Sequence, residues 1–286
     1  MKIEVKNLTK KYGKKEALKN ISFQLEGSKI YGLLGRNGAG KTTFMDILAG
    51  YSLPTSGEVK VNGENPFDHT ELLEQICLMK ESDNFHRDMR IKHIYKTCSL
   101  FFPNWDQDFA DELTEQFGLN KRARMKTLSK GMSSAVGIIV GLASKAPITI
   151  FDEPYIGLDA ASRKKFYDIL LDEYENEKRM IIFSTHLIDE VSLLFEEVLI
   201  LQEGELILQE KADVLRNSAF AVTGELSEVK KFIANKKVMK TKQLANTMTA
   251  YIFGDKEEAI HANFQVEGIP IQELMIYLTE KGKEAM

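Results

Sequence analysis

One short segment constrains the fold of this 286-residue chain more than any other. Residues 35–42 read Gly-Arg-Asn-Gly-Ala-Gly-Lys-Thr, a glycine followed by four residues and then Gly-Lys-Thr. The segment follows an apolar run, Tyr31–Leu34, and precedes a helical pattern, which is the context of a phosphate-binding loop. Glycines let backbone N–H groups wrap a phosphate chain, and the helix that follows adds its N-terminal dipole. We therefore expect Lys41 to reach the β- and γ-phosphates of a nucleotide and the Thr42 hydroxyl to bind Mg²⁺.

Two adjacent acids, Asp152 and Glu153, follow the apolar run Ile148–Phe151. A buried strand that delivers carboxylates at its C-terminal end suits a Mg-nucleotide site. Adjacent strand residues point to opposite faces, so the two acids need different roles. We expect Asp152 to lie beside Mg²⁺, directly or through water, and Glu153 to orient or deprotonate an attacking water. A solvated strand end is the alternative, and the phosphate loop upstream favours the functional interpretation.

Short apolar runs separated by helical segments indicate an α/β fold. They recur at residues 31–34, 148–151, 180–183 and 198–201. This pattern is typical of a mostly parallel sheet covered by helices on both faces. Residues 3–8 and 21–25 alternate apolar and polar side chains, so we expect half-buried strands in an N-terminal antiparallel part. The helix-rich block at about 86–145 predicts an inserted helical subdomain within a domain that spans residues 1–216.

The pattern changes after about residue 216, and we expect residues 217–286 to form a small C-terminal α+β domain. Residues 219–233 resemble residues 249–263, with Gly224 and Gly254 aligned. Each half reads as a strand, a turn made by a glycine and an acid, a short helix and a strand. Two such halves would make a ferredoxin-like layer. The similarity is weak, and coincidence stays open as an explanation.

Composition excludes several classes of protein. The chain carries 38 Lys+Arg against 42 Asp+Glu, a net charge of −4, which gives no general attraction to nucleic acid or anionic lipid. Its two cysteines make no disulfide framework and no metal cluster is evident. No stretch approaches the roughly 18–20 apolar residues that cross a bilayer, and the N-terminus is too polar for a signal peptide. We expect a cytosolic protein whose membrane role, if any, comes through a partner.

Further motifs occur in a set order around the loop and the two acids. Leu-Ser-Lys-Gly-Met at 128–132 precedes the acids, Gly-Leu-Asp at 157–159 follows them, and His186 comes just after the run 180–183. Tyr12 precedes the phosphate loop. Together these motifs resemble the ATP-binding cassette (ABC) ATPase family over roughly residues 1–215. The resemblance is specific because six motifs agree in order and spacing.

The resemblance implies a role for each matching position. Tyr12 would stack on adenine, Glu153 and His186 would be catalytic, and Asp159 would lie at the interface between two cassettes. Ser129 and Gly131 would bind the γ-phosphate of an ATP held by the opposite protomer. The nucleotide-binding residues implied are Tyr12, Gly35, Asn37, Gly38, Ala39, Gly40, Lys41, Thr42, Thr43, Ser129 and Gly131. The implied cofactors are ATP and Mg²⁺, with Thr42 and Asp152 as metal-binding residues.

Two departures from the family pattern stand out. The signature is usually Leu-Ser-Gly-Gly-Gln, and here Lys130 and Met132 replace its third and fifth residues. The family also places a glutamine before the helical insert, where this chain has Glu81. A carboxylate can ligate Mg²⁺ but adds negative charge near the γ-phosphate. Whether Glu81 coordinates the metal or simply lies in a loop is left open by the sequence.

The resemblance implies an ATP-hydrolysing subunit of a bacterial, exporter-type ABC transporter, peripheral on the cytoplasmic face of the membrane. Two cassettes, as a homodimer or a heterodimer, would close around MgATP and drive a separate transmembrane permease. Most of an aromatic- and aliphatic-rich segment would pack the helical subdomain, and the rest would form a groove for a short permease helix. The segment contains Phe85, Ile91, Ile94, Tyr95, Phe101, Phe102 and Trp105.

Other functions remain as alternatives. A soluble cassette ATPase acting on ribosomes or DNA is one, although the chain has a single phosphate loop and no long heptad stretch. A GTPase lacks support, because Asn235-Lys-Lys is followed by Val238 rather than completing a guanine-reading Asn-Lys-x-Asp. The C-terminal residues are either a regulatory or dimerisation module or a packing appendage.

Overall fold

The computed structural model describes residues 1–67, 69–186, 188–254, 256–261 and 264–281. The chain divides into two compact units, one formed by Met1–His186 and Leu199–Leu206 and the other by Leu187–Val198 and Ile207–Met286. This division differs from the single boundary expected after residue 216. The second unit takes in earlier segments because helices within them pack against elements of the C-terminal residues.

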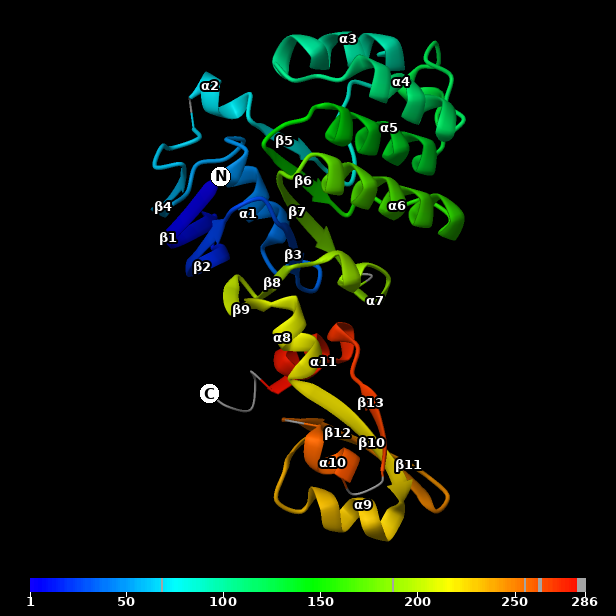
Figure 1. The fold of residues 1–286 in the computed structure, drawn as a ribbon. Helices are drawn as coiled ribbons and strands as arrows, with labels where there is room; N and C mark the ends of the chain where they lie inside the picture. The colour runs from blue at the N-terminus through cyan, green and yellow to red at the C-terminus, as the bar shows by residue number, and fades with distance from the viewer. Residues whose placement is uncertain (68, 187, 255, 262–263, 282–286) are drawn as a thin grey trace. The chain divides into compact units, whose positions relative to one another are not determined.

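A six-stranded sheet forms the centre of the cassette, with strand order β5-β6-β7-β3-β8-β9 (Figure 1). Its strands are β3 (Ile30–Leu34), β5 (Ile76–Met79), β6 (Ile148–Asp152), β7 (Met180–Thr185), β8 (Glu197–Gln202) and β9 (Glu205–Lys211). The pairs β5–β6, β6–β7 and β7–β3 are parallel. Strands β3, β5, β6 and β7 are buried along their whole length, which explains their near-continuous apolar sequence.

Alternate side chains of these strands pack into two different layers, as the two-residue period of a strand requires. Ile150 and Ile182 belong to a core that also contains Phe44 of helix α1 (Lys41–Leu48). Phe151 and Phe183 point the other way, and their rings contact Phe166 with centroids 5.6 and 5.8 Å apart. Phe166 belongs to helix α6 (Ala160–Asn176). The predicted α/β fold with a helix-covered parallel sheet is confirmed.

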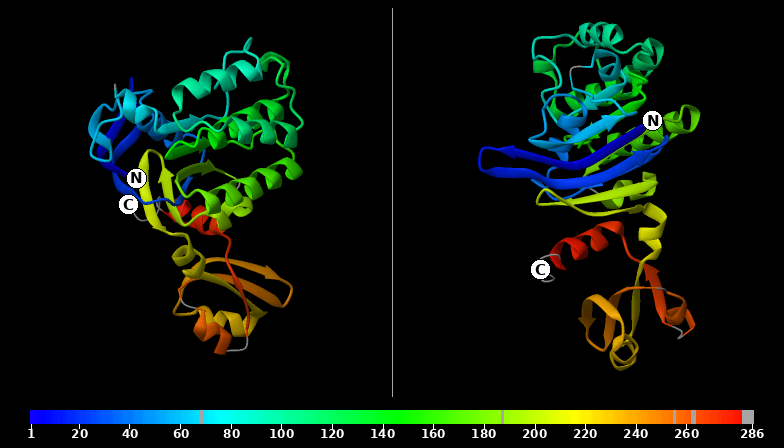
Figure 2. Two further views of the ribbon diagram at one scale, coloured as in Figure 1. Left: turned by 45° about the horizontal axis from the view of Figure 1, so that its top comes forward. Right: turned by 90° about the vertical axis from the view of Figure 1, so that its left-hand side faces the viewer.

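The N-terminal part is a second, antiparallel sheet with strand order β2-β1-β4. Strands β1 (Lys2–Tyr12) and β2 (Lys15–Glu26) form a long hairpin, and β4 (Ser56–Val61) pairs with β1 (Figure 2). The short helix α2 (Thr70–Leu73) connects β4 to β5. The apolar side chains of this sheet share one core with α1 and the central strands, and Ala39 of the 35–42 segment belongs to the same core.

The chain between β5 and β6 is helical. It contains α3 (Ile91–Phe101), α4 (Gln107–Gln116), the 3₁₀ turn η1 (Met125–Thr127) and α5 (Lys130–Ala143). Asp106 caps α4 by accepting a hydrogen bond from the Phe109 N–H, and Gly118 follows its C-cap with a φ of 63°. Residues Ile91, Ile94 and Tyr95 are at most 1% exposed and form the core of this subdomain.

The second unit contains a four-stranded antiparallel sheet with strand order β11-β12-β10-β13. Its elements run β10 (Ala219–Glu225), α9 (Leu226–Ile233), β11 (Lys237–Leu244), β12 (Thr247–Phe253), α10 (Glu257–His261) and β13 (Gln265–Gly268). This βαββαβ order is that of a ferredoxin-like layer. The unit also holds α7 (Ile188–Val191), the 3₁₀ turn η2 (Ser192–Leu194), α8 (Ala212–Asn217) and α11 (Ile271–Lys281). The repeat expected at 249–263 extends into residues 262–263, which lie outside the described residues.

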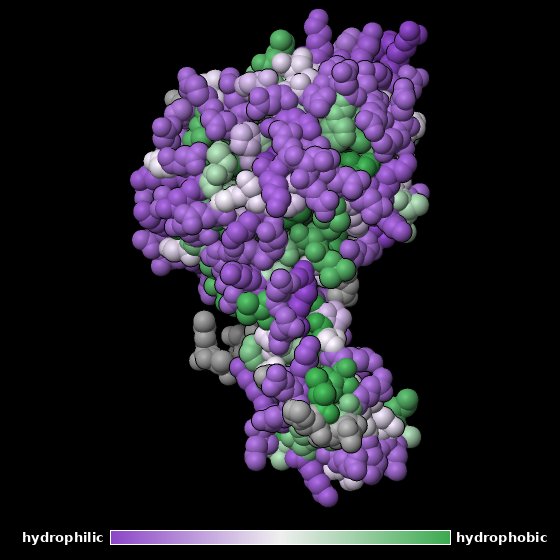
Figure 3. Space-filling model, viewed as in Figure 1, coloured by the Kyte–Doolittle hydropathy of each residue, from purple (hydrophilic) through white to green (hydrophobic). Residues whose placement is uncertain are grey.

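On the face shown in Figure 3 the surface is mainly hydrophilic, with hydrophobic residues in scattered groups. Among the described residues, no helix combines the length and the apolar character that spanning a membrane requires. Cys77 and Cys98 are both free thiols and buried, and burial raises the pKa of each to about 12. They are therefore protonated, unreactive parts of the core.

Candidate nucleotide and catalytic site

The predicted phosphate loop and the predicted acids meet at one edge of the central sheet. Strands β6, β7 and β3 are neighbours and run parallel, so their carboxyl ends lie side by side. The loop at residues 35–40 follows β3, the acids end β6, and Ser184 and Thr185 end β7. The topology thus brings together residues that are more than a hundred positions apart in the sequence.

Lys41 begins helix α1 and is only 6% exposed. Its Nζ donates to the Gly35 carbonyl at 2.8 Å and lies 3.9 Å from Glu153 Oε1. Burial lowers the pKa of Lys41, while the charges of Glu153 and Asp152 act to raise it. Gly40, just before it, has a φ of 109°, and a Cβ there would lie 2.6 Å from the Ala17 carbonyl oxygen. Only glycine fits this position, which gives the loop its path.

Thr42, Asp152 and Ser184 form a hydrogen-bonded chain of oxygens. Thr42 Oγ1 donates to Asp152 Oδ2 at 2.7 Å, and Ser184 Oγ donates to Asp152 Oδ1. Among the described residues no group of three His, Cys, Asp or Glu side chains gathers as a metal cluster. One carboxylate and one hydroxyl nevertheless suit Mg²⁺, which is held by few protein oxygens together with phosphates and water. The donor set therefore fits the magnesium role predicted for Thr42 and Asp152.

Glu153 is held in an unusual conformation at the end of β6. Its φ is 51°, in the left-handed region, and its N–H donates to Ser184 Oγ at 3.2 Å. Its Oε2 accepts a hydrogen bond from the Tyr155 hydroxyl and lies 2.7 Å from His186 Nδ1. Its Oε1 is buried 3.9 Å from Lys41 Nζ, and no described residue makes a hydrogen bond to it. A buried carboxylate with one unpaired oxygen is suited to accept a hydrogen bond from a water.

Lys41, Thr42, Asp152 and Glu153 line one cavity of about 350 Å³. Its lining contains Tyr12, Lys15, Ala17, Asn37, Gly38, Ala39, Gly40, Lys41, Thr42, Thr43, Glu81, Asp152 and Glu153. Tyr12 is half exposed at the end of β1, and Lys10 Nζ lies 4.9 Å from its ring centroid. The cavity therefore combines an exposed aromatic ring, a glycine-rich loop with a buried cation, and two carboxylates.

Known proteins similar to this chain identify its family. A family model described as ABC transporter matches residues 18–156. An uncharacterised ABC transporter ATP-binding protein of Methanocaldococcus jannaschii is 34% identical over 200 residues, which cover 68% of this chain and 71% of that protein. The chain belongs to the ABC transporter ATP-binding family.

Other ABC proteins show the extent of the similarity. YtrB of Bacillus subtilis, an ABC transporter ATP-binding protein, is 25% identical over 189 residues, covering 66% of this chain and 65% of YtrB. BcrA of Bacillus licheniformis, a bacitracin transport ATP-binding protein, is 30% identical over 195 residues, covering 67% of this chain and 64% of BcrA. The match thus spans slightly less than two thirds of these two relatives. A dimeric ATP-binding cassette solved with ADP and phosphate shares the fold, with a TM-score of 0.64, 24% identity and coverage of 73% of this chain and 98% of that one.

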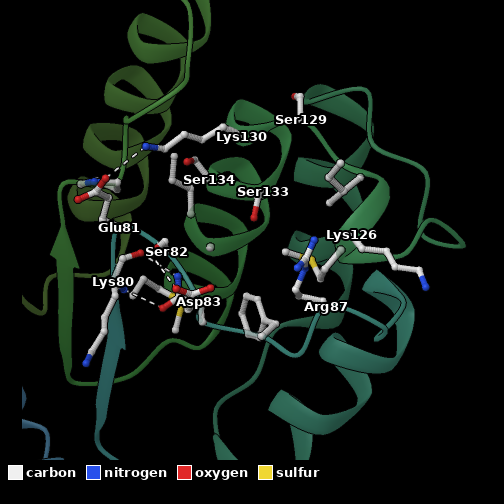
Figure 4. Close-up of a pocket in the computed structure, with 18 residues that line it drawn as sticks. Lys80, Glu81, Ser82, Asp83, Arg87, Lys126, Ser129, Lys130, Ser133 and Ser134 are labelled. Carbon is white, nitrogen blue, oxygen red and sulfur yellow. Dashed lines mark hydrogen bonds and ion pairs between the residues drawn. The ribbon is translucent and has the colours of Figure 1, made fainter.

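Leu128, Ser129 and Lys130 of the ABC signature line a second cavity, of about 310 Å³, together with residues of the β5–α3 connection (Figure 4). Ser129 is the N-cap of α5 and accepts a hydrogen bond from the Met132 N–H at 3.2 Å. Gly131 packs so closely that a Cβ there would lie 2.4 Å from the Gly157 carbonyl oxygen. Asp159 caps α6, and the Ser162 N–H that it accepts lowers the pKa of its carboxyl.

Glu81 and Lys130, the two charged departures from the ABC pattern, contact each other. Lys130 Nζ lies 3.3 Å from Glu81 Oε1, and Figure 4 shows the two side chains pointing toward each other. Glu81 also lines the nucleotide cavity, so this residue borders both cavities. A magnesium role for Glu81 stays a prediction, and its present partner is a cation on the signature helix.

Sequence reasoning missed Tyr155, Ser184 and Thr185, which complete the environment of the two acids. The Tyr155 hydroxyl contacts Glu153, Thr185 Oγ1 and the His186 N–H. Ser184 and Thr185 could have been found from the sequence, because they are two polar residues that end an apolar run just before His186. Tyr155 has no comparable signal, because its role depends on where its ring packs.

Proposed function

We propose that this ABC cassette binds MgATP, hydrolyses it, and drives transport through a separate permease. One observation carries the proposal. The cavity that holds the phosphate loop also holds a threonine–aspartate pair suited to Mg²⁺ and a glutamate with an unpaired oxygen. Binding, metal and hydrolytic chemistry are thus combined in one place.

Each residue of the site would have its own role in binding or hydrolysis. Backbone N–H groups of the loop at residues 35–40 and the α1 N-terminus would bind phosphate oxygens, and Lys41 would add a buried positive charge. Bound Mg²⁺ would neutralise charge on the phosphates. Glu153 would use Oε1 to orient a water and take its proton. His186, whose ring is half exposed beside Glu153, would face the γ-phosphate with its other nitrogen.

A second cassette is part of this proposal. Ser129 lines the signature cavity rather than the nucleotide cavity of its own chain, which supports its action, together with the nearby Gly131, on ATP held by a partner. Asp159 lies exposed at the α6 N-terminus, where it could contact a neighbour. ATP between the two cassettes would favour closure, and hydrolysis would release it.

The permease would dock on the helical subdomain. A third cavity of about 870 Å³ is lined by Tyr51, Leu73, Phe85, Met89, Leu100, Phe101 and Phe102, among others. Phe101 is 62% exposed and Leu100 is 78% exposed, although both are large apolar residues. A short amphipathic permease helix would cover such a groove and place the cassette on the cytoplasmic face of the membrane.

The relatives support transport over the alternative of a cassette acting on ribosomes or DNA. The relatives reported above are ABC transporter or bacitracin transport ATP-binding proteins. The net charge of −4 gives no general attraction to nucleic acid. The direction of transport and the cargo would be set by the permease.

The test is Glu153→Gln in the purified protein. Loss of the general base should lower ATP turnover by roughly 10²- to 10⁴-fold, while MgATP binding and ATP-dependent dimerisation persist. Glu228→Gln, on the exposed side of α9, is the control and should keep wild-type turnover. Normal turnover in Glu153→Gln would remove Glu153 from its assigned role, and absence of MgATP binding in the wild type would overturn the proposed function itself.

A further inference from the structure

Tyr155 lies two residues after Glu153 and is buried, with 2% of its surface exposed. Its ring stacks on Phe183 of β7 at a centroid distance of 6.2 Å and an interplanar angle of 19°. The His186 ring lies 5.8 Å away on another side. Because the ring is packed in this way, its hydroxyl cannot move far without emptying space in the core.

The Tyr155 hydroxyl has a full set of hydrogen bonds. It donates to Glu153 Oε2, and its oxygen accepts the His186 backbone N–H at 3.1 Å. Thr185 Oγ1 lies 2.7 Å away and supplies the second donor. A tyrosine hydroxyl has one donor and two acceptor positions, so these three partners saturate it. Burial, followed by the hydrogen bond to the Glu153 carboxylate, raises the pKa of Tyr155, so the hydroxyl stays protonated and remains a donor.

This arrangement makes the two oxygens of Glu153 unequal. Oε2 is held by the Tyr155 hydroxyl and faces His186 Nδ1 at 2.7 Å, whereas Oε1 is buried 3.9 Å from Lys41 Nζ and has no hydrogen-bond partner among the described residues. A carboxylate free to rotate about its last torsion could exchange these positions. The hydroxyl fixes which oxygen faces the nucleotide cavity.

We propose that Tyr155 is a positioning residue for hydrolysis: its hydroxyl presents Oε1 of Glu153 to the attacking water and ties the carboxylate to the backbone of His186. This inference rests on the proposed function, since it concerns the same reaction. Tyr155 does not touch the substrate and acts through Glu153 and His186. Removing its hydroxyl should therefore slow turnover without weakening ATP binding.

The test is Tyr155→Phe, which keeps the ring and deletes the hydroxyl. The kcat for ATP should fall roughly 10- to 100-fold, part of the usual contribution of a positioned general base, while KM stays within about twofold. The matched control is Tyr174→Phe. The Tyr174 hydroxyl is also a hydrogen-bond donor, but its acceptor is the Ser28 carbonyl, 2.5 Å away in the connection between β2 and β3, rather than the Glu153 carboxylate. Tyr174→Phe should leave kcat unchanged even where it lowers thermal stability.

A combined variant separates positioning from a structural role. In a Glu153→Gln background, Tyr155→Phe should cause no further loss of kcat, because residues that act as one unit are not additive. A further tenfold loss in that background, or an unchanged kcat in Tyr155→Phe alone, would overturn the inference.

A measurement without turnover keeps the inference testable if the proposed function fails. Amide hydrogen exchange at His186 should accelerate several-fold in Tyr155→Phe and not in Tyr174→Phe, because only the former deletes the acceptor of that N–H. Unchanged exchange would show that the hydroxyl does not hold the His186 backbone. If His186 exchange accelerates as expected in Tyr155→Phe but the wild-type protein has no ATPase activity, the proposed function fails while the hydrogen bond to His186 stands.

Discussion

At the scale of the residue, Gly131 shows how a signature position serves packing as well as binding. The resemblance assigns it to contact with phosphate, but the structure adds a local reason for glycine. Its α-carbon faces the Gly157 backbone so closely that any side chain would collide with the carbonyl oxygen. The segment 157–159 and the signature are therefore held together by contact between two glycines.

Gly131→Ala should displace the signature from this position. ATP-dependent dimerisation, measured by gel filtration in a Glu153→Gln background, should weaken at least tenfold, which corresponds to about 1.4 kcal/mol, while MgATP still binds to the single cassette. Gly137→Ala on the same helix is the control, because its added Cβ would meet only Asn84 Nδ2 at 3.7 Å. If both variants dimerise like the parent, the close contact between Gly131 and Gly157 is not needed for dimerisation.

At the scale of the element, buried strands were predictable and exposed pairings were not. Strands β3, β6, β7 and β8 appear in the sequence as apolar runs because they are largely buried. The expectation for β1 stopped at Leu8, whereas the strand continues to Tyr12, because its last residues are polar and are ordered by pairing with β2. The alternation of apolar and polar residues cannot reveal where a hairpin continues through polar residues.

The candidate site also contains residues that the sequence predicted and residues that it did not. Motif spacing located Lys41, Thr42, Asp152 and Glu153, which the fold brings into one cavity. The Tyr155 hydroxyl and the Glu81–Lys130 pair depend on distances between separate elements, which no local pattern encodes. The magnesium, signature and interface roles of individual residues stay predictions.

The Glu81–Lys130 pair links the end of β5 to the first turn of α5, and we expect it to be weak. Both side chains are about half exposed, so their coupling in a double-mutant cycle of Glu81→Gln and Lys130→Gly should be about 0.2–1 kcal/mol in unfolding free energy. The coupling should shrink in 1 M salt because exposed charges are screened.

Lys126→Ala provides the control for this cycle. Lys126 lines the same cavity but pairs with Asp88 at 2.6 Å, so its coupling to Glu81→Gln should be near zero. A Glu81–Lys130 coupling no larger than this control would mean that the two departures from the ABC pattern are independent.

At the scale of the whole molecule, the second unit is built from two separate stretches of the chain, because residues 187–198 belong to it as well as the C-terminal residues. Helix α7 follows His186 closely along the chain, and α11 packs against it. Ile188 and Val191 of α7 are fully buried, and Ile271 and Leu274 of α11 are at most 2% exposed. The sequence predicted a separate C-terminal domain and gave no sign that helix α11 would cover the segment that follows His186.

Truncation after Gly268 removes α11 and leaves the ferredoxin-like sheet intact. The uncovered α7 should lower the melting temperature and reduce ATPase activity several-fold, while MgATP affinity stays near that of the full chain because the cavity-lining residues are unchanged. The control is Leu244→Ala, at an 82%-exposed position on β11, which should alter neither property. Full activity and stability in the truncated protein would contradict this role for α11.

The pairing of α7 with α11 has a consequence for how the chain is made. During synthesis α7 leaves the ribosome well before its cover, and the whole ferredoxin-like sheet is translated between them. The buried side chains of α7 are therefore covered only after residues 271–281 have emerged, later than strands β10 to β13 are made. A growing chain would consequently hold the phosphate loop before it can bury the helix that follows His186.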